Sequence, residues 1–293
     1  MRRTGRAVTP KKRAVIPKNA FDERFAGQNL QDCWEKLHKG DQEQYPDTAW
    51  VTRLAKRYPK FGAWIKSHGG AGEVAAGVQE AWRRFHAGDF TGAIDGGGKL
   101  GALGATPANK AAAIHSQYAQ GDEAHRLALL TGAMKRGEQA IELLPDYPNA
   151  HYMLALVMGR YSQRISILKA LADGIAARVR THLDATLELE PRHAEAHIAL
   201  GMYHAEIVAK IGSLLAGLTY GATREAAMEH FGRALQLTPG SPIAHIEYAN
   251  GLLLLDAAGN RAQARKLYAR AAACAAADAM EQLDVQRAQH PPA

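Results

Sequence analysis

One pattern, written three times between Ala133 and Leu253, constrains the fold more than any other feature of the sequence. Each copy is a proline followed five and six residues later by Ala-His: Pro145 with Ala150-His151, Pro191 with Ala196-His197, and Pro239 with Ala244-His245. Before the third proline, Ala227, Phe231 and Ala234 recur about once per helical turn, so they share one helix face. The proline then ends that helix, because its ring removes a donor and disfavours helical dihedrals in the preceding residue.

Each unit is therefore predicted to contain helix A, a turn and helix B, ended by the proline. This arrangement resembles the tetratricopeptide repeat, a helix-turn-helix unit of about 34 residues with a ladder of small residues and a terminal proline. The ladder Ala227, Phe231, Ala234 and Pro239 stands at that family's spacing. One departure is that His151, His197 and His245 stand where the family has a first-helix Trp.

The units are also longer than that repeat. The prolines are 191 − 145 = 46 and 239 − 191 = 48 residues apart, which is about 12 and 14 residues more than the repeat requires. The extra residues lie in the middle of each unit, because both flanks keep the register. Residues 206–218 alternate apolar and polar side chains at helical spacing, which predicts an amphipathic continuation of helix A. We therefore expect two adjacent, unusually tall helical hairpins.

Long repeats with a Leu-Thr-Tyr-Gly break before helix B, here Leu218 to Gly221, are also similar to the helical domain of the regulator of microtubule dynamics family. The resemblance covers about Asn149 to Ala277. It implies a helical domain, and the family's domain is implicated in protein contacts and in lipid binding at membranes. Lipid binding is therefore a hypothesis that the resemblance supplies.

The predicted fold class is all-α, a right-handed α-solenoid of stacked antiparallel helix pairs with an N-terminal helical cap. No alternating run of β-branched residues argues for a strand. The expected organisation is a basic disordered tail (1–20), a cap of short aromatic helices (21–70), a solenoid of about five helix pairs, two of them elongated (71–277), and a C-terminal tail that frays (278–293).

The net charge of +7 belongs to the first twenty residues, which hold seven Lys or Arg and no Asp or Glu. The rest of the chain has 36 − 7 = 29 basic residues against 29 acidic ones. A neutral body argues against a specific nucleic-acid-binding face. The tail is expected to be solvated, and the alternative is a weak electrostatic contact with acidic lipid, RNA or a protein.

The sequence contains no apolar run long enough to cross a membrane and no apolar segment of a secretory signal at its start. The two cysteines, Cys33 and Cys274, are far apart in sequence and are expected to be reduced thiols. These observations predict a cytoplasmic protein.

Two sequence motifs could indicate a binding or catalytic site. Residues 96–101 match G-x-G-x-x-G, but the motif binds a pyrophosphate only between a strand and a helix, and a helical register precedes it here. His193, His197 and His204 share one helix face, as the ligands of a metal-dependent enzyme would. Because His197 recurs as His151 and His245 without such a cluster, we interpret it as a packing residue. We predict no enzyme, no cofactor and no metal, and the histidine face is the least favoured function.

The remaining hypothesis concerns the concave face, which helix A lines in tetratricopeptide stacks. The family's groove positions correspond here to Asn149, Tyr152, Leu156, Arg160, Glu195, Ile198, Met202, Glu206, Ile243, Ile246, Asn250 and Leu253. Because this groove is unusually apolar, we expect it to bind a helix or peptide of a protein partner. One alternative is a lipid or another hydrophobic small ligand near a membrane surface. Another is that the chain's own N-terminal cap fills the groove.

Overall fold

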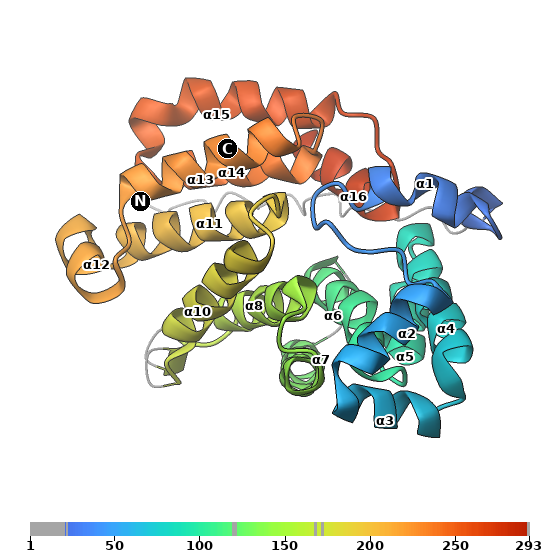
Figure 1. Ribbon diagram of the computed structural model, residues 1–293. Helices are drawn as coiled ribbons and strands as arrows, with labels where there is room; N and C mark the ends of the chain where they lie inside the picture. Colours follow the sequence, from blue (N-terminus) through green and yellow to red (C-terminus); the bar gives the residue numbers. More distant parts are fainter. Residues whose placement is uncertain (1–20, 22, 119–121, 167–168, 171–172, 292–293) are drawn as a thin grey trace.

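The chain is built of helices, paired in chain order and arranged along an arc (Figure 1). The computed structural model describes residues 21, 23–118, 122–166, 169–170 and 173–291, and these residues contain no strand. The elements are η1 (Glu23–Phe25), α1 (Asn29–Leu37), α2 (Thr48–Arg57), α3 (Pro59–Ser67), α4 (Gly70–Ala87), α5 (Phe90–Gly97), α6 (Gly101–Tyr118), α7 (Glu123–Leu143), α8 (Pro148–Ser162), α10 (Ile175–Leu189), α11 (Ala194–Ile211), α12 (Ser213–Tyr220), α13 (Arg224–Leu237), α14 (Pro242–Leu255), α15 (Ala257–Ala272) and α16 (Ala279–Ala288). The all-α prediction is confirmed.

The helices pack as successive pairs. Within pairs, α4 packs on α5, α6 on α7, α8 on α10, α11 on α13, and α14 on α15. Between pairs, α6 packs on α8 and α11 on α14, so the helices that begin each unit lie along the inner side of the arc (Figure 1). This stacking is the solenoid-like arrangement that the repeated prolines predict. The predicted tail of residues 1–20 lies outside the described residues. None of the described helices has the length and apolar character of a membrane span.

Two glycines let three helices approach around one aromatic ring. Phe231 of α13 is 1% exposed and stacks on Tyr248 of α14, with ring centroids 5.1 Å apart. A Cβ added at Gly201 of α11 would lie 2.6 Å from the Phe231 ring, and one at Gly251 of α14 would lie 2.4 Å from it. The small residues at these positions are therefore required by the ring that fills the space between the helices.

The three Ala-His histidines close the turns that the prolines make. The Nε2 atoms of His151, His197 and His245 lie 2.8, 3.3 and 2.9 Å from the carbonyl oxygens of the prolines six residues earlier. Each ring N–H thus donates to a carbonyl that proline leaves at the end of the preceding helix. The Nδ1 atoms of His151 and His197 face histidines on helix B. The Nδ1 atom of His182 lies 3.2 Å from that of His151, and the Nδ1 atom of His230 lies 2.9 Å from that of His197.

Two segments differ from their predicted structure. The amphipathic continuation of helix A breaks at Gly212, where a φ of 79° ends α11 and redirects the chain into the short helix α12. From its polar composition we predict that the chain after Asp278 frays. In the structure these residues instead form α16. Leu283 of α16 is 1% exposed, and the helix packs against α14, α15 and α4. The helix is stabilised because its apolar side is buried against the other helices, although most of its residues are polar.

We expect Gly201→Ala and Gly251→Ala each to lower the free energy of unfolding by about 1–3 kcal/mol, because the added methyl overlaps the Phe231 ring. Gly232→Ala on α13 is the matched control. No atom stands within 4 Å of its added Cβ, so it should stabilise the helix by about 0.5–1 kcal/mol. Urea unfolding followed by circular dichroism measures all three. Equal effects in the three variants would contradict this account of the packing.

Candidate functional site

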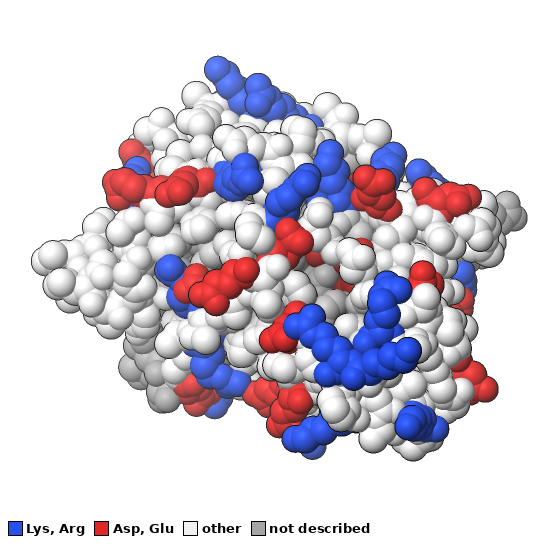
Figure 2. Space-filling model, viewed as in Figure 1, with Lys and Arg blue, Asp and Glu red and all other residues white. Residues whose placement is uncertain are grey.

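The concave side of the arc holds a pocket between α8, α10 and α11. Its volume is about 270 Å³, and its polar rim is completed by α6, α14 and α16. Its apolar wall includes Leu156, Val179, Ile198, Met202, Ile207 and Ile243. Figure 2 shows the hollow at the centre of this face, with charged side chains of both signs around it. The lining also includes the polar side chains of Lys110, Tyr152, Glu195 and Asp284, of which Lys110 pairs with Glu195.

Eight of the twelve predicted groove residues line this pocket: Tyr152, Leu156, Arg160, Glu195, Ile198, Met202, Glu206 and Ile243. Asn250 and Leu253 line a shallower hollow beside it, which shares Arg160 and Met202 with the pocket. Asn149 and Ile246 are buried elsewhere, at 2% and 0% exposure. Neither lines the open pocket, because Asn149 bonds to the N-terminal cap and Ile246 packs in the core with α15.

The N-terminal cap, residues 21–70, also contacts helices beyond the first helix pair. The segment between α1 and α2, residues 38–47, crosses the inner side of the arc (Figure 1). Asn149 of α8 donates to the Asp41 carbonyl at 2.9 Å, and the Glu195 amide of α11 donates to the Gly40 carbonyl at 3.1 Å. The chain itself therefore covers the inner ends of α8 and α11, and the pocket is the part left open.

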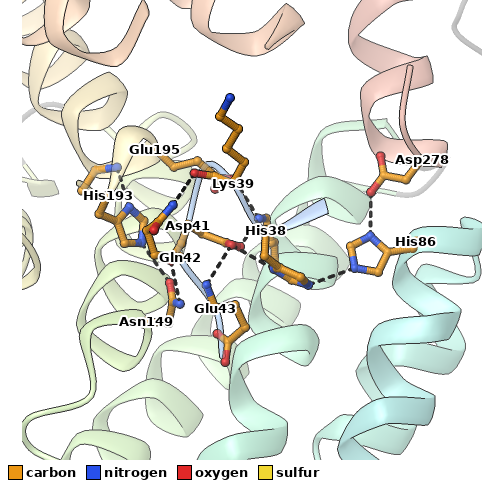
Figure 3. Close-up of polar contacts among 12 residues, drawn as sticks. His38, Lys39, Asp41, Gln42, Glu43, His86, Asn149, His193, Glu195 and Asp278 are labelled. Atoms are coloured by element: carbon orange, nitrogen blue, oxygen red, sulfur yellow. Dashed lines mark hydrogen bonds and ion pairs between the residues drawn. The ribbon is translucent and has the colours of Figure 1, made fainter. Parts of the chain in front are cut away.

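A buried lysine fixes this segment. Lys110 of α6 is 4% exposed, and its Nζ lies 2.6 Å from Asp41 Oδ2 and 2.9 Å from Glu195 Oε1 (Figure 3 shows both carboxylates). Burial alone would lower the pKa of Lys110, but the two carboxylates outweigh it and raise the pKa. Burial likewise works against the Asp41 carboxylate, yet Lys110 and His38 hold its pKa well below the usual range. The cap is thus joined to α6 and α11 by paired charges away from water.

A chain of imidazoles continues this network to the C-terminal helix. His38 Nδ1 lies 2.9 Å from Asp41 Oδ1, His38 Nε2 lies 3.2 Å from His86 Nε2, and His86 Nδ1 lies 2.7 Å from Asp278 Oδ2 (Figure 3). Burial lowers the pKa of His38 to about 4 despite the neighbouring Asp41 carboxylate, so His38 is neutral at pH 7. The cap, α4 and the start of α16 are therefore connected.

Glu43 is a second buried acid in the same segment. The Tyr147 hydroxyl donates to its Oε1 atom, while Oε2 is buried with no hydrogen-bond partner among the described residues. Burial, and then the Asp41 charge, raise the pKa of Glu43 from 4.5 to about 8. Glu43 is therefore largely protonated at neutral pH, and its uncharged form is the one that this site accommodates.

The histidine face does not gather its nitrogens at one point. His193 caps α11 by accepting from the Ala196 amide and donates to Asn149 Oδ1 at 2.9 Å. His197 pairs with His230, and His204 Nδ1 accepts from the Thr223 amide at 3.3 Å. Within the described ranges, no three His, Cys, Asp or Glu side chains are arranged to hold a metal ion. The string at 96–101 joins α5 to α6, so it has no strand before it.

Sequence reasoning missed three contributors to the site. Nothing in the pattern around Lys110 indicates that its ammonium group pairs with a residue 69 positions away. Met280 and Asp284 line the pocket from α16, a helix that the polar composition hides. Burial raises the pKa of Asp284 to about 8, and the Tyr118 hydroxyl donates to it at 3.3 Å.

We expect Glu43→Gln to become progressively more stabilising relative to the wild type as the pH rises from 5 to 8. Above pH 4.5 the unfolded chain loses the Glu43 proton while the folded chain keeps it, so the wild type loses stability up to about pH 8. An uncharged glutamine escapes this loss, which is on the order of 4 kcal/mol at pH 8. Urea unfolding over this pH range measures it, with the exposed Glu142→Gln as control. A pH-independent difference would contradict the assignment.

Comparison with known proteins places the chain. No curated protein matches it. The model of the family described as regulator of microtubule dynamics protein 1-3 matches residues 108–290, which is 183 of 293 residues. The match confirms the resemblance at Asn149 to Ala277 and extends it into α6 and to α16, so all the residues that line the pocket lie within it. The tetratricopeptide resemblance stays a prediction. The chain belongs to the regulator of microtubule dynamics protein 1-3 family.

Proposed function

We propose that this chain is a non-enzymatic scaffold that binds an apolar segment of a protein partner in the pocket on its concave face. The observation that carries the proposal is the row of half-buried apolar side chains that the chain's own cap leaves uncovered. Leu156, Met202, Ile207 and Ile243 come from α8, α11 and α14, the first helices of three successive pairs, and line one pocket. Aliphatic anchors of a helix or peptide fit such a wall, as in other helix-in-groove complexes.

The rim suits a peptide as well. Arg160, Glu206 and Lys210 stand beside the apolar wall and offer charges of both signs to a partner's backbone or side chains. The residues that line the pocket include no His and no Cys, so they lack the usual nucleophile-and-base pairing. The family's description names a regulator, which supports a protein partner. A cytoplasmic location is part of the same proposal, and both cysteines are free thiols.

The second candidate is an amphiphilic small ligand with one acyl chain. The observation in its favour is that one pocket presents both apolar side chains, such as Ile175 and Val179, and charged groups, such as Lys110 and Asp284. A chain and a head group would each find a matching surface. The same family resemblance supplies this alternative.

We expect Met202→Glu to abolish partner binding, with a loss of at least about 100-fold in affinity, because the carboxylate would have to lose its water against the partner's apolar side chains. Met202 is half-buried, so the fold should survive, which circular dichroism verifies. Leu189→Glu is the matched control, since Leu189 is 39% exposed and lies outside both hollows. Pull-down from the native host followed by affinity measurement tests both. Unchanged binding by Met202→Glu would remove the pocket from the interface.

Native mass spectrometry of gently purified protein separates the two candidates. A bound polypeptide that Met202→Glu loses and Leu189→Glu keeps supports the scaffold. An added mass of a few hundred daltons that organic solvent extracts supports the amphiphile. A bare chain under conditions that preserve known weak complexes would contradict tight binding of either kind.

A further inference from the structure

The short helix α12 exposes three leucines to solvent. Leu214, Leu215 and Leu218 are 76%, 57% and 78% exposed, and Ala216 is the one buried residue of the helix. They are spaced to share one side of the helix. In Figure 1, α12 stands at the far left, at the end of the tall hairpin begun by α11. Contiguous exposed leucines of this kind mark an interaction site on a folded protein.

The leucines are exposed because the backbone turns at both ends of α12 and holds the helix away from the core. Gly212 and Gly221 bound α12 with positive φ values of 79° and 60°, so the helix is set off from both α11 and α13. Ala216 and Ala222 attach it to the body beside Tyr203 and Val208. The three leucines are left on the outward side of this attachment.

The shape and size of the tip fit a lipid bilayer better than a protein. The tip is convex and bears no Lys, Arg, Asp or Glu, as the white surface at the left of Figure 2 shows. Each side of a stable protein interface usually contributes about 20–30 residues, whereas this patch rests on three side chains. A fluid apolar layer accepts isolated convex side chains without a complementary pocket.

The charge of the chain supplies a second membrane signal. The first twenty residues carry seven Lys or Arg and no acidic residue. Single apolar anchors bind bilayers weakly, and a basic segment that is attracted to anionic lipid makes the attachment stable. The two signals together select a membrane with a negative surface.

We propose that α12 inserts Leu214, Leu215 and Leu218 into the interfacial layer of an anionic lipid bilayer, with the basic N-terminal segment adding electrostatic attraction. This docking is independent of what occupies the concave pocket.

The test is co-flotation of the full chain with vesicles of phosphatidylcholine alone and of phosphatidylcholine with phosphatidylserine. The wild type should float with the anionic vesicles. Leu214→Ser, Leu215→Ser and Leu218→Ser combined should reduce the bound fraction at least about 10-fold. The control, Leu189→Ser with Leu254→Ser, removes exposed leucines elsewhere and should bind as the wild type does. Replacing the seven basic residues of the first twenty by Gln should weaken binding to the anionic vesicles.

A second measurement does not depend on loss of binding. Leu218→Trp should gain a blue-shifted emission on anionic vesicles that bromine-labelled acyl chains quench, beyond any change in the wild type. The proposal is overturned if the wild type fails to float, if the triple variant floats equally, or if Leu218→Trp is not quenched. It is also overturned if the leucines instead drive a concentration-dependent dimer that the triple variant abolishes.

Discussion

The structure depends on a charge that water does not reach. The Lys110 ammonium sits between Asp41 and Glu195, which come from the N-terminal cap and from α11. A buried ammonium is tolerated only with its partners in place, so this lysine requires residues 38–47 to lie across the helices of the solenoid. His38, His86 and Asp278 extend the requirement to the start of α16. Both ends of the described chain are thereby fixed to the same inner surface.

This attachment gives the concave face its character. An open solenoid would offer a long groove, but the cap covers the inner ends of α8 and α11 and α16 borders the other side. What remains is a pocket with an apolar wall and several polar groups in its lining. The same covering explains why Asn149, at a groove position of the repeat, bonds within the protein instead of facing a partner.

Repetition accounts for the framework, and departures from it mark the features that set this chain apart. His151 contacts His182 and His197 contacts His230, but the equivalent His245 of the last unit has no histidine partner on helix B. There Leu267 stands at the corresponding position, and the Nδ1 atom of His245 is buried without a hydrogen bond within the described chain. The unit with the longest proline spacing contains α12, whose leucines are exposed rather than stacked.

The sequence by itself determined the helical pairs, because small residues, prolines and apolar spacing act locally and recur in register. It also placed most of the pocket wall, since Leu156 and Met202 occupy one repeated position of helix A and Ile198 occupies another. Only the tertiary structure decided what covers that wall and where the extra residues go. The partners of Lys110 lie 69 and 85 residues away in the chain, the single glycine Gly212 turns an amphipathic helix outward, and the burial of α16 depends on contacts with α14 and α15. Such long-range contacts leave no periodic trace, because a buried charge or a docked helix is stabilised by its partners and not by its own neighbours in sequence.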